Sequence, residues 1–152
     1  MDSALNVVSP VFYGISLVPR SLWRVYGYTL LTIAGSDGIV SDPELEWLTM
    51  DLAGKVGVPD EIIEDWEAFD YDMADLEELF SSFNSSTISN FSKLLLYDAI
   101  RMSYADGEYA LEEKEKVMQA AQMMNVSIDS VVAIEALVDL EQAAEKLRMT
   151  LF

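Results

Sequence analysis

The sequence predicts an all-α protein, a single-domain bundle of about seven to eight helices built from two related halves, about 21–83 and 88–150. Apolar residues recur three and four positions apart along most of the chain, and no segment alternates apolar and polar residues as a half-buried strand does. In addition, residues 37–44 recur as residues 106–113. Both copies have Asp-Gly followed by a glutamate seven positions after the aspartate. Such a repeat indicates two copies of one supersecondary unit.

The chain before the first half is expected to differ from the two repeated units. Residues 1–20 contain two prolines and are expected to form an N-terminal arm or a short helix, whereas residues 21–152 form the helical domain. The first helix of that domain covers about 21–36. It ends at the Asp-Gly pair, because glycine adopts the left-handed conformation that closes many helices.

The second helix has a clear start signal. Ser41-Asp-Pro-Glu44 is a capping box with proline in the first turn, so the helix begins there and continues to Gly57. A third helix begins near Pro59 and a short fourth one near Asp72.

The second half repeats this plan after a serine-rich connector, residues 81–90, in which Thr87 or Ser89 is the expected helix cap. Ala110 stands where the first half has Ser41, so the second capping box is incomplete. Its helix start is expected to be less stable by about 1 kcal/mol. The helices expected in this half cover about 88–104, 111–124, 128–138 and 140–150.

Composition excludes several kinds of site. The chain has no cysteine and no histidine. It therefore has no disulfide, thiolate nucleophile, structural zinc site, haem ligand or histidine-based triad. Among metals, this leaves hard cations that bind oxygen, such as calcium or magnesium.

Charge restricts the partners. The formal net charge is −18, and acidic residues are dense between Asp42 and Glu78. Such a surface repels nucleic acids and anionic lipids, so we expect no nucleic-acid binding and no membrane insertion. A cation, a protein partner or a second copy of the chain is the expected partner. With no secretory signal and no span of sufficient apolar length, a cytoplasmic location is expected.

The repeated phrase matches the second half of an EF-hand loop, with Asp, Gly, an apolar residue and Glu at loop positions 5, 6, 8 and 12. Position 1 would be Ile33 or Met102, and position 3 would be Gly35 or Tyr104. None of these supplies a carboxylate, so an ordinary EF-hand is excluded.

The phrase resembles more closely that of the TerB-like (tellurite-resistance protein B) family, which also occurs as the N-terminal domain of a membrane-anchored J-domain co-chaperone. That family has an all-helical domain with two turns of the form apolar-x-x-Ala-x-Asp-Gly-x-Val/Ile-x-x-x-Glu. The resemblance covers about residues 21–150. The chain departs from the pattern at Ser36, Ala110 and Asn125.

The resemblance implies that Asp37, Glu44, Asp106 and Glu113 are the acidic positions near which a divalent cation (Ca or Mg) binds. A purely structural use is the alternative. Each aspartate can accept hydrogen bonds from loop amides, and each glutamate can accept one from the amide of the helix cap. If the halves pack about a pseudo-twofold axis, the two turns converge and can share one ion.

Two tryptophans are the interface candidates. Trp47 lies off the apolar stripe of its helix, and Trp23 belongs to an aromatic group near the start of the domain. Core packing is the alternative use of that group.

Together these features predict a non-enzymatic, acidic helical module that resembles TerB-like tellurite-resistance and stress-response proteins and binds a divalent cation or a partner protein. The alternatives are a carboxylate-based enzyme and a structural interaction domain without a ligand. The lack of histidine and cysteine, of a glycine-rich phosphate loop and of a hydrolase elbow disfavours the enzyme.

Overall fold

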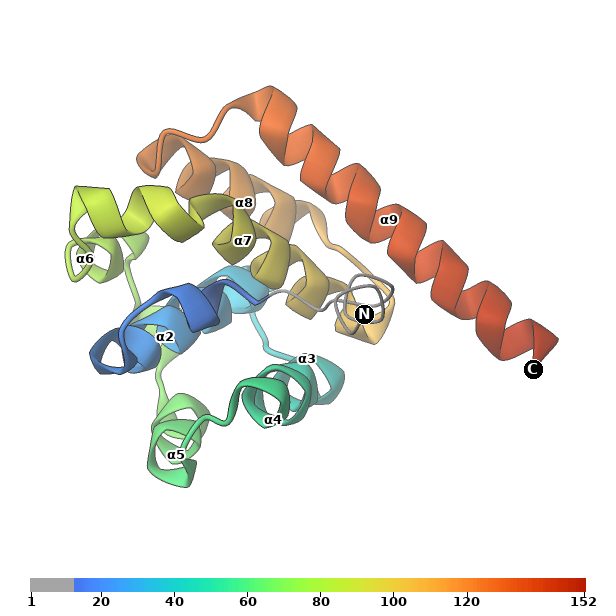
Figure 1. Ribbon diagram of the computed structural model, residues 1–152, viewed down its shortest axis with the longest axis horizontal. Coiled ribbons are helices and arrows are strands. Elements are labelled where there is room, and N and C mark those ends of the chain that lie inside the picture. The colour runs from blue at the N-terminus through green and yellow to red at the C-terminus, as the bar shows by residue number, and fades with distance from the viewer. Residues whose placement is uncertain (1–12) are drawn as a thin grey trace, which may run out of the picture.

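A computed structural model describes residues 13–152, except the side chain of Ser85, and these residues form helices without any β-strand. Figure 1 shows the helices packed in a bundle from which one end of the last helix projects. The α-helices are α2 (Trp23–Ala34), α3 (Asp42–Glu46), α4 (Ala53–Val56), α5 (Asp60–Ala68), α6 (Leu76–Phe80), α7 (Ser85–Ser103), α8 (Leu111–Met123) and α9 (Ile128–Leu151).

Shorter helical turns join these elements. A π-helical segment, η4 (Trp47–Leu52), makes α3 and α4 one continuous helix, so the described part of the chain has seven helices, in agreement with the expected all-α class. The 3₁₀ turns are η1 (Gly14–Leu17), η2 (Arg20–Leu22), η3 (Gly35–Asp37), η5 (Tyr71–Met73) and η6 (Tyr104–Asp106).

The two halves repeat the same order of elements. Helix α2, turn η3, the helix from α3 to α4, and α5 correspond to α7, η6, α8 and α9. Gly38 and Gly107 close the two turns with φ of 108° and 88°, a conformation that favours glycine. The structure therefore has the repeat that the sequence predicts.

The halves are interlocked. Helix α2 packs along α7, α3 packs against turn η6 of the other half, and α8 packs against turn η3. Each half thus places the start of its second helix beside the turn of the other half. This exchange brings the two repeated phrases together.

The π-helical segment explains the one gap in the repeat. Glu44 and Glu113 are 69 positions apart, whereas Gly57 and Asn125 are 68 positions apart, so the first copy has one extra residue between these points. A π-bulge accommodates one extra residue within a helix. The segment η4 lies in this interval, whereas α8 is α-helical throughout.

Three expected element boundaries are wrong. The helices expected at 128–138 and 140–150 are one helix, α9, because no glycine or proline interrupts it. Helix α7 is capped by Asn84, whose side chain accepts a hydrogen bond from the Thr87 amide at 2.7 Å. Helix α6 begins after Asp75, not at Asp72, where turn η5 lies.

The core is centred on α2 and α7, with α5 and α6 packed against α2 and α8 and α9 packed against α7. Trp66 of α5 is 1% exposed, and its ring occupies the space beside Gly27 of α2, where a Cβ atom would lie 2.1 Å from the ring. Of the expected N-terminal arm, residues 1–12 lie outside the described part. From residue 14, turn η1 packs against α7.

Candidate functional site

Both aspartates of the repeated phrase stabilise their own turns. The Oδ1 atom of Asp37 accepts a hydrogen bond from the Ile39 amide at 3.4 Å, and that of Asp106 accepts one from the Glu108 amide at 3.0 Å. Both side chains are exposed. Such aspartate turns account for these residues without a ligand.

The two glutamates are buried at the starts of the following helices. Glu44 is 1% exposed and Glu113 is 0% exposed. The Oε1 atom of Glu44 accepts a hydrogen bond from the Ser41 amide at 2.9 Å, and that of Glu113 accepts one from the Ala110 amide at 2.8 Å. Only the first copy has the reciprocal bond, from the Glu44 amide to the Ser41 hydroxyl at 3.3 Å, because alanine has no acceptor.

The two glutamates, one from each half, lie close together where the halves cross. The side chains of Glu44 and Glu113 are near enough to share a hydrogen bond. Yet the Oε2 atom of each is buried and receives no N–H or O–H bond from the described residues. Two carboxyl groups can approach to hydrogen-bonding distance only when a proton or a cation lies between them, because two ionised carboxylates offer only acceptors.

The electrostatics of this pair are those of a buried acidic cluster. Burial, together with the hydrogen bond to Glu44 and its charge, raises the pKa of Glu113 to about 9. Burial also raises the pKa of Glu44, whose charge is opposed by that of Asp106. The Asp37 carboxylate likewise opposes the charge of Glu113. Ionisation of both carboxyls is therefore unfavourable unless a cation lies between them.

The structure thus brings together two of the four expected acidic residues directly and leaves the two aspartates at the rim. Within residues 13–152, no group of three or more acidic residues is arranged to hold a metal ion. The cation-binding roles of Asp37, Glu44, Asp106 and Glu113 stay predictions.

The interface candidates differ in burial. Trp23 is 6% exposed, and its Nε1 donates a hydrogen bond to the Val18 carbonyl at 3.1 Å. The ring is covered within its own chain, which favours core packing, and the interface role of Trp23 stays a prediction. Trp47 is half-buried, with its ring centroid 6.0 Å from that of Tyr13, and its interface role stays a prediction.

Sequence reasoning missed a buried charged cluster on α7. Asp98 is 0% exposed and forms an ion pair with Arg101. Its Oδ2 atom accepts hydrogen bonds from the Tyr26 hydroxyl at 2.6 Å and the Gly14 amide at 2.8 Å. Burial raises the pKa of Asp98 to about 6 despite these contacts. An aspartate and an arginine three positions apart within an apolar helix could have signalled this cluster.

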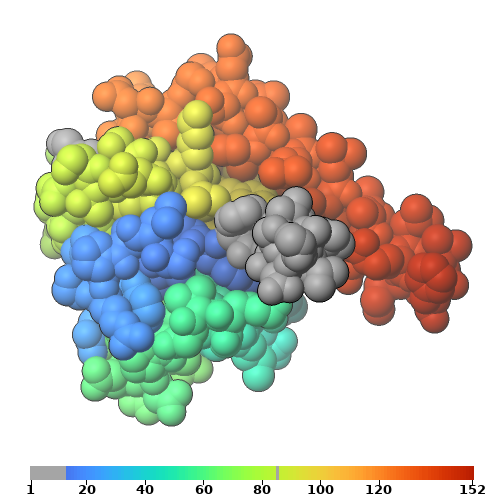
Figure 2. Space-filling view, in the orientation of Figure 1, coloured from blue at the N-terminus to red at the C-terminus, as the bar shows by residue number. Residues whose placement is uncertain are grey.

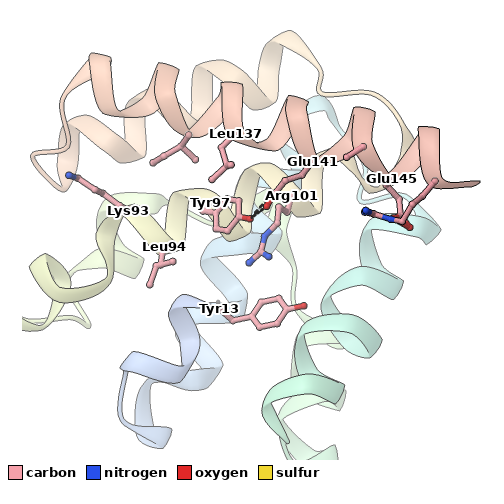
Figure 3. Close-up of a pocket in the computed structure, with 11 residues that line it drawn as sticks. Tyr13, Lys93, Leu94, Tyr97, Arg101, Leu137, Glu141 and Glu145 are labelled. Carbon is pink, nitrogen blue, oxygen red and sulfur yellow. Dashed lines mark hydrogen bonds and ion pairs between the residues drawn. The ribbon is translucent and has the colours of Figure 1, made fainter. Parts of the chain in front are cut away.

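The Arg101 guanidinium lies between aromatic rings, 3.9 Å from the ring centroid of Tyr97 and 4.6 Å from that of Tyr13. Figure 3 shows these side chains at one wall of a groove between α7 and α9, with Glu141 beside Tyr97. The groove has a volume of about 790 Å³. It lies apart from the glutamate pair, which does not line it.

Tyrosines attach α9 to the bundle. The Tyr97 hydroxyl donates to Glu141 at 2.6 Å and the Tyr109 hydroxyl to Glu135 at 2.8 Å, while the Tyr104 hydroxyl donates to Asp139. Burial and the hydrogen bond to Glu141 raise the pKa of Tyr97 to about 12. These bonds let an acidic helix pack on an acidic protein without direct contact between carboxylates.

Comparison with known proteins agrees with this architecture. The family profile described as "Tellurite resistance protein TerB" matches residues 28–136, more than half of the chain. The chain belongs to the TerB family. Among solved structures it is similar to a tellurite resistance protein from Nostoc punctiforme, with 30% identity and a TM-score of 0.71 over 88% of this chain and 81% of that chain. The search among curated proteins found no match.

The TerB match includes both Asp-Gly turns and both buried glutamates. The family assignment therefore covers the part of the chain in which the two halves interlock.

In the described residues, no helix has the length and apolar character needed to cross a membrane.

Proposed function

We propose that this TerB-family protein is a non-enzymatic module that binds one divalent cation between Glu44 and Glu113. The observation that supports this function is the pair of buried Oε2 atoms, one from each half, that receive no hydrogen bond from the described residues. A buried carboxylate oxygen without a partner is unfavourable. A cation would neutralise both charges and link the halves.

The donor set fits magnesium better than calcium. Calcium takes six to eight oxygen ligands, whereas magnesium is commonly held by one or two carboxylates and keeps several waters. The pair offers two oxygens that are not used by cap amides. Asp37 and Asp106 at the rim add negative potential that favours a cation.

The enzyme alternative is disfavoured by the position of the pair. Two carboxyls with raised pKa values are also found in acid–base catalysis. Here, however, both glutamates accept hydrogen bonds from helix caps and are at most 1% exposed, so a substrate has no access to them.

Family membership supports a proposal for the physiological role. The similar structure is described as a tellurite resistance protein, and we propose that this chain serves tellurite resistance or a general stress response. The expected cytoplasmic location is part of this proposal.

A thermal-melting experiment tests the cation. Wild type is melted in magnesium chloride, calcium chloride and sodium chloride at equal ionic strength, and native mass spectrometry reports any bound ion. Saturation at a hundredfold excess over Kd stabilises the native state by about 2.7 kcal/mol. For a chain of this size, this raises the melting temperature by roughly 5–10 °C.

The variants make the test specific. Glu113→Gln keeps an oxygen for the Ala110 amide and can donate to Glu44, so it is expected to fold but to lose the ion-specific rise. Glu112→Gln is the matched control, because Glu112 is the exposed neighbour. If wild type shows no ion-specific rise, or if Glu113→Gln retains it, the pair does not bind a cation.

A further inference from the structure

Helix α9 has an exposed apolar seam, two of whose members, Leu137 and Ala144, also line the groove against α7. Its members alternate in spacing between four and three positions, the heptad pattern of coiled coils. They are all exposed, and the leucines among them range from 45% for Leu137 to 69% for Leu140. The seam consists of Ala133, Leu137, Leu140, Ala144, Leu147 and Leu151.

The seam is distinct from the face with which α9 packs on its own chain. That face contains Val131 and Val138, both 0% exposed, together with the partly buried Ile134. At 3.6 residues per turn, most of the seam lies on the side of the helix away from Val131 and Val138, while Leu137 and Ala144 lie between the two faces, at the groove. From residue 143 onward every residue is exposed, and Figures 1 and 2 show this end of α9 projecting from the body.

We propose that the seam is a homodimer interface, in which α9 of a second copy packs antiparallel against it. The seam is self-complementary in this orientation. Leu137 of one copy lies opposite Leu147 of the other, Leu140 lies opposite Ala144, and Ala133 lies opposite Leu151. Every layer is apolar, and every contact occurs twice, as a twofold interface requires.

Charges beside the seam favour the antiparallel orientation. Glu141 and Arg148 lie seven positions apart on one flank, along the groove between α7 and α9 in which Figure 3 labels Glu141. Within one chain, Glu141 accepts a hydrogen bond from the Tyr97 hydroxyl and Arg148 pairs with Glu145, so a contact between two copies adds to these bonds. In an antiparallel pair, the Glu141 of one copy and the Arg148 of the other lean toward each other, because helical side chains point toward their own N-terminus. In a parallel pair, Glu141 meets the opposite flank, which consists of Ala136, Ala143 and Thr150.

A second copy fits the seam better than a lipid surface does. The net charge of −18 repels anionic lipid head groups. The same charge also disfavours association of two copies at other acidic surfaces. The described part of α9 carries both signs of charge next to its apolar seam, so two copies can meet there. This proposal does not depend on the cation between the glutamates.

Mass measurement tests the dimer. Analytical ultracentrifugation of wild type is expected to give twice the chain mass of 17.0 kDa at high concentration. The double variant Leu140→Glu/Leu147→Glu is expected to give the mass of one chain with an unchanged helical spectrum, because both side chains are exposed. Met149→Glu is the matched control: Met149 is 76% exposed on the same helix but lies off the seam, so this variant stays dimeric. A monomeric wild type, or a dimer that survives the double variant, overturns the proposal.

Cross-linking tests the orientation. The chain has no cysteine, so introduced thiols react without background. When Leu137→Cys chains are mixed with Leu147→Cys chains and oxidised, the antiparallel pair is expected to give disulfides between the two kinds of chain. Each variant alone gives little, because its two thiols are roughly ten residues of helix rise apart. Efficient cross-linking within each variant would indicate a parallel pair and overturn the proposal.

Discussion

The two Asp-Gly turns have similar backbones but different side-chain support. In the first turn, the ring of Tyr71 packs over Gly35, and its hydroxyl accepts a hydrogen bond from the Val40 amide at 3.0 Å. In the second turn, the residue equivalent to Gly35 is Tyr104, which supplies its own ring and packs on Tyr109 at 5.3 Å. An aromatic ring thus lies at both turns, but only in the second turn does the ring belong to a residue of the turn itself.

The helices after the two turns differ in the same way. The first has a complete capping box, a π-helical segment and Gly57 at its end. The second has half a capping box, regular α-helix and Asn125 with φ of 61° at its end. Equivalent positions therefore reach the same fold with unequal local stabilisation.

The third helices of the two halves, α5 and α9, should show the largest difference in the stability lost when an apolar side chain is removed. Trp66 of α5 and Ile134 of α9 are equivalent positions, but only Trp66 is fully buried. We expect Trp66→Ala to lower the free energy of unfolding by about 3–5 kcal/mol and Ile134→Ala to lower it by roughly 1–2 kcal/mol. Urea unfolding followed by circular dichroism measures both. If the two losses were equal, α9 would depend on apolar packing as much as α5 does, and its tyrosine–carboxylate bonds would not substitute for such packing.

The first helices of the two halves, α2 and α7, should differ in how they make stability depend on pH. Asp98 of α7 is equivalent to Thr29 of α2, whose hydroxyl donates to the Val25 carbonyl at 2.8 Å and does not titrate. Since burial raises the pKa of Asp98 from 3.8 to about 6, the folded state binds a proton in this range that the unfolded state does not. The contribution of Asp98 to stability is therefore largest below pH 4 and falls as pH rises through 6.

Relative to Asp98→Asn, we expect wild type to lose about 1 kcal/mol between pH 5 and pH 7. Thr29→Val serves as the control and should not alter the pH dependence. Both are measured as urea midpoints at several pH values. A constant difference between wild type and Asp98→Asn across this range would show that Asp98 stays ionised when folded.

Exchange of the caps should have the smallest effect. Ser41→Ala removes the side-chain acceptor at the N-cap of α3 and is expected to lower the free energy of unfolding by about 1 kcal/mol. Ala110→Ser adds an acceptor at the N-cap of α8 and is expected to raise it by up to about 1 kcal/mol. In the double variant the two changes should nearly cancel, which thermal melting can detect. No gain from Ala110→Ser would mean that contacts between the halves already hold the second helix start.

Local signals predicted the turns and several helix starts. Gly38 and Gly107 adopt the positive φ that the Asp-Gly pairs indicate, and Ser41 forms the expected capping box. Other boundaries were missed because two local signals competed. Asn84 precedes Thr87 in the same polar connector and caps α7 instead, and the two helices expected at 128–138 and 140–150 are one helix because no glycine or proline separates them.

The candidate site was likewise predicted only in part from the sequence. The acidic residues were found from their spacing, but the sequence could not show that Glu44 and Glu113 meet while the aspartates stay at the rim. The burial of Trp23 was likewise inaccessible, because it depends on which element covers that face. For the Asp98 cluster, the sequence offered only the i, i+3 spacing of Asp98 and Arg101, whereas its partners Tyr26 and Gly14 come from tertiary packing.

The amino-acid sequence by itself determined the helical class, the two repeated units and the turns that close them, because periodicity, caps and glycine act over a few neighbouring residues. Only the tertiary structure decided that the halves interlock, with the start of each second helix against the other turn. Long-range packing alone brings two like-charged glutamates together, since no local preference favours that contact. It also leaves the outer seam of α9 exposed and available to a second copy.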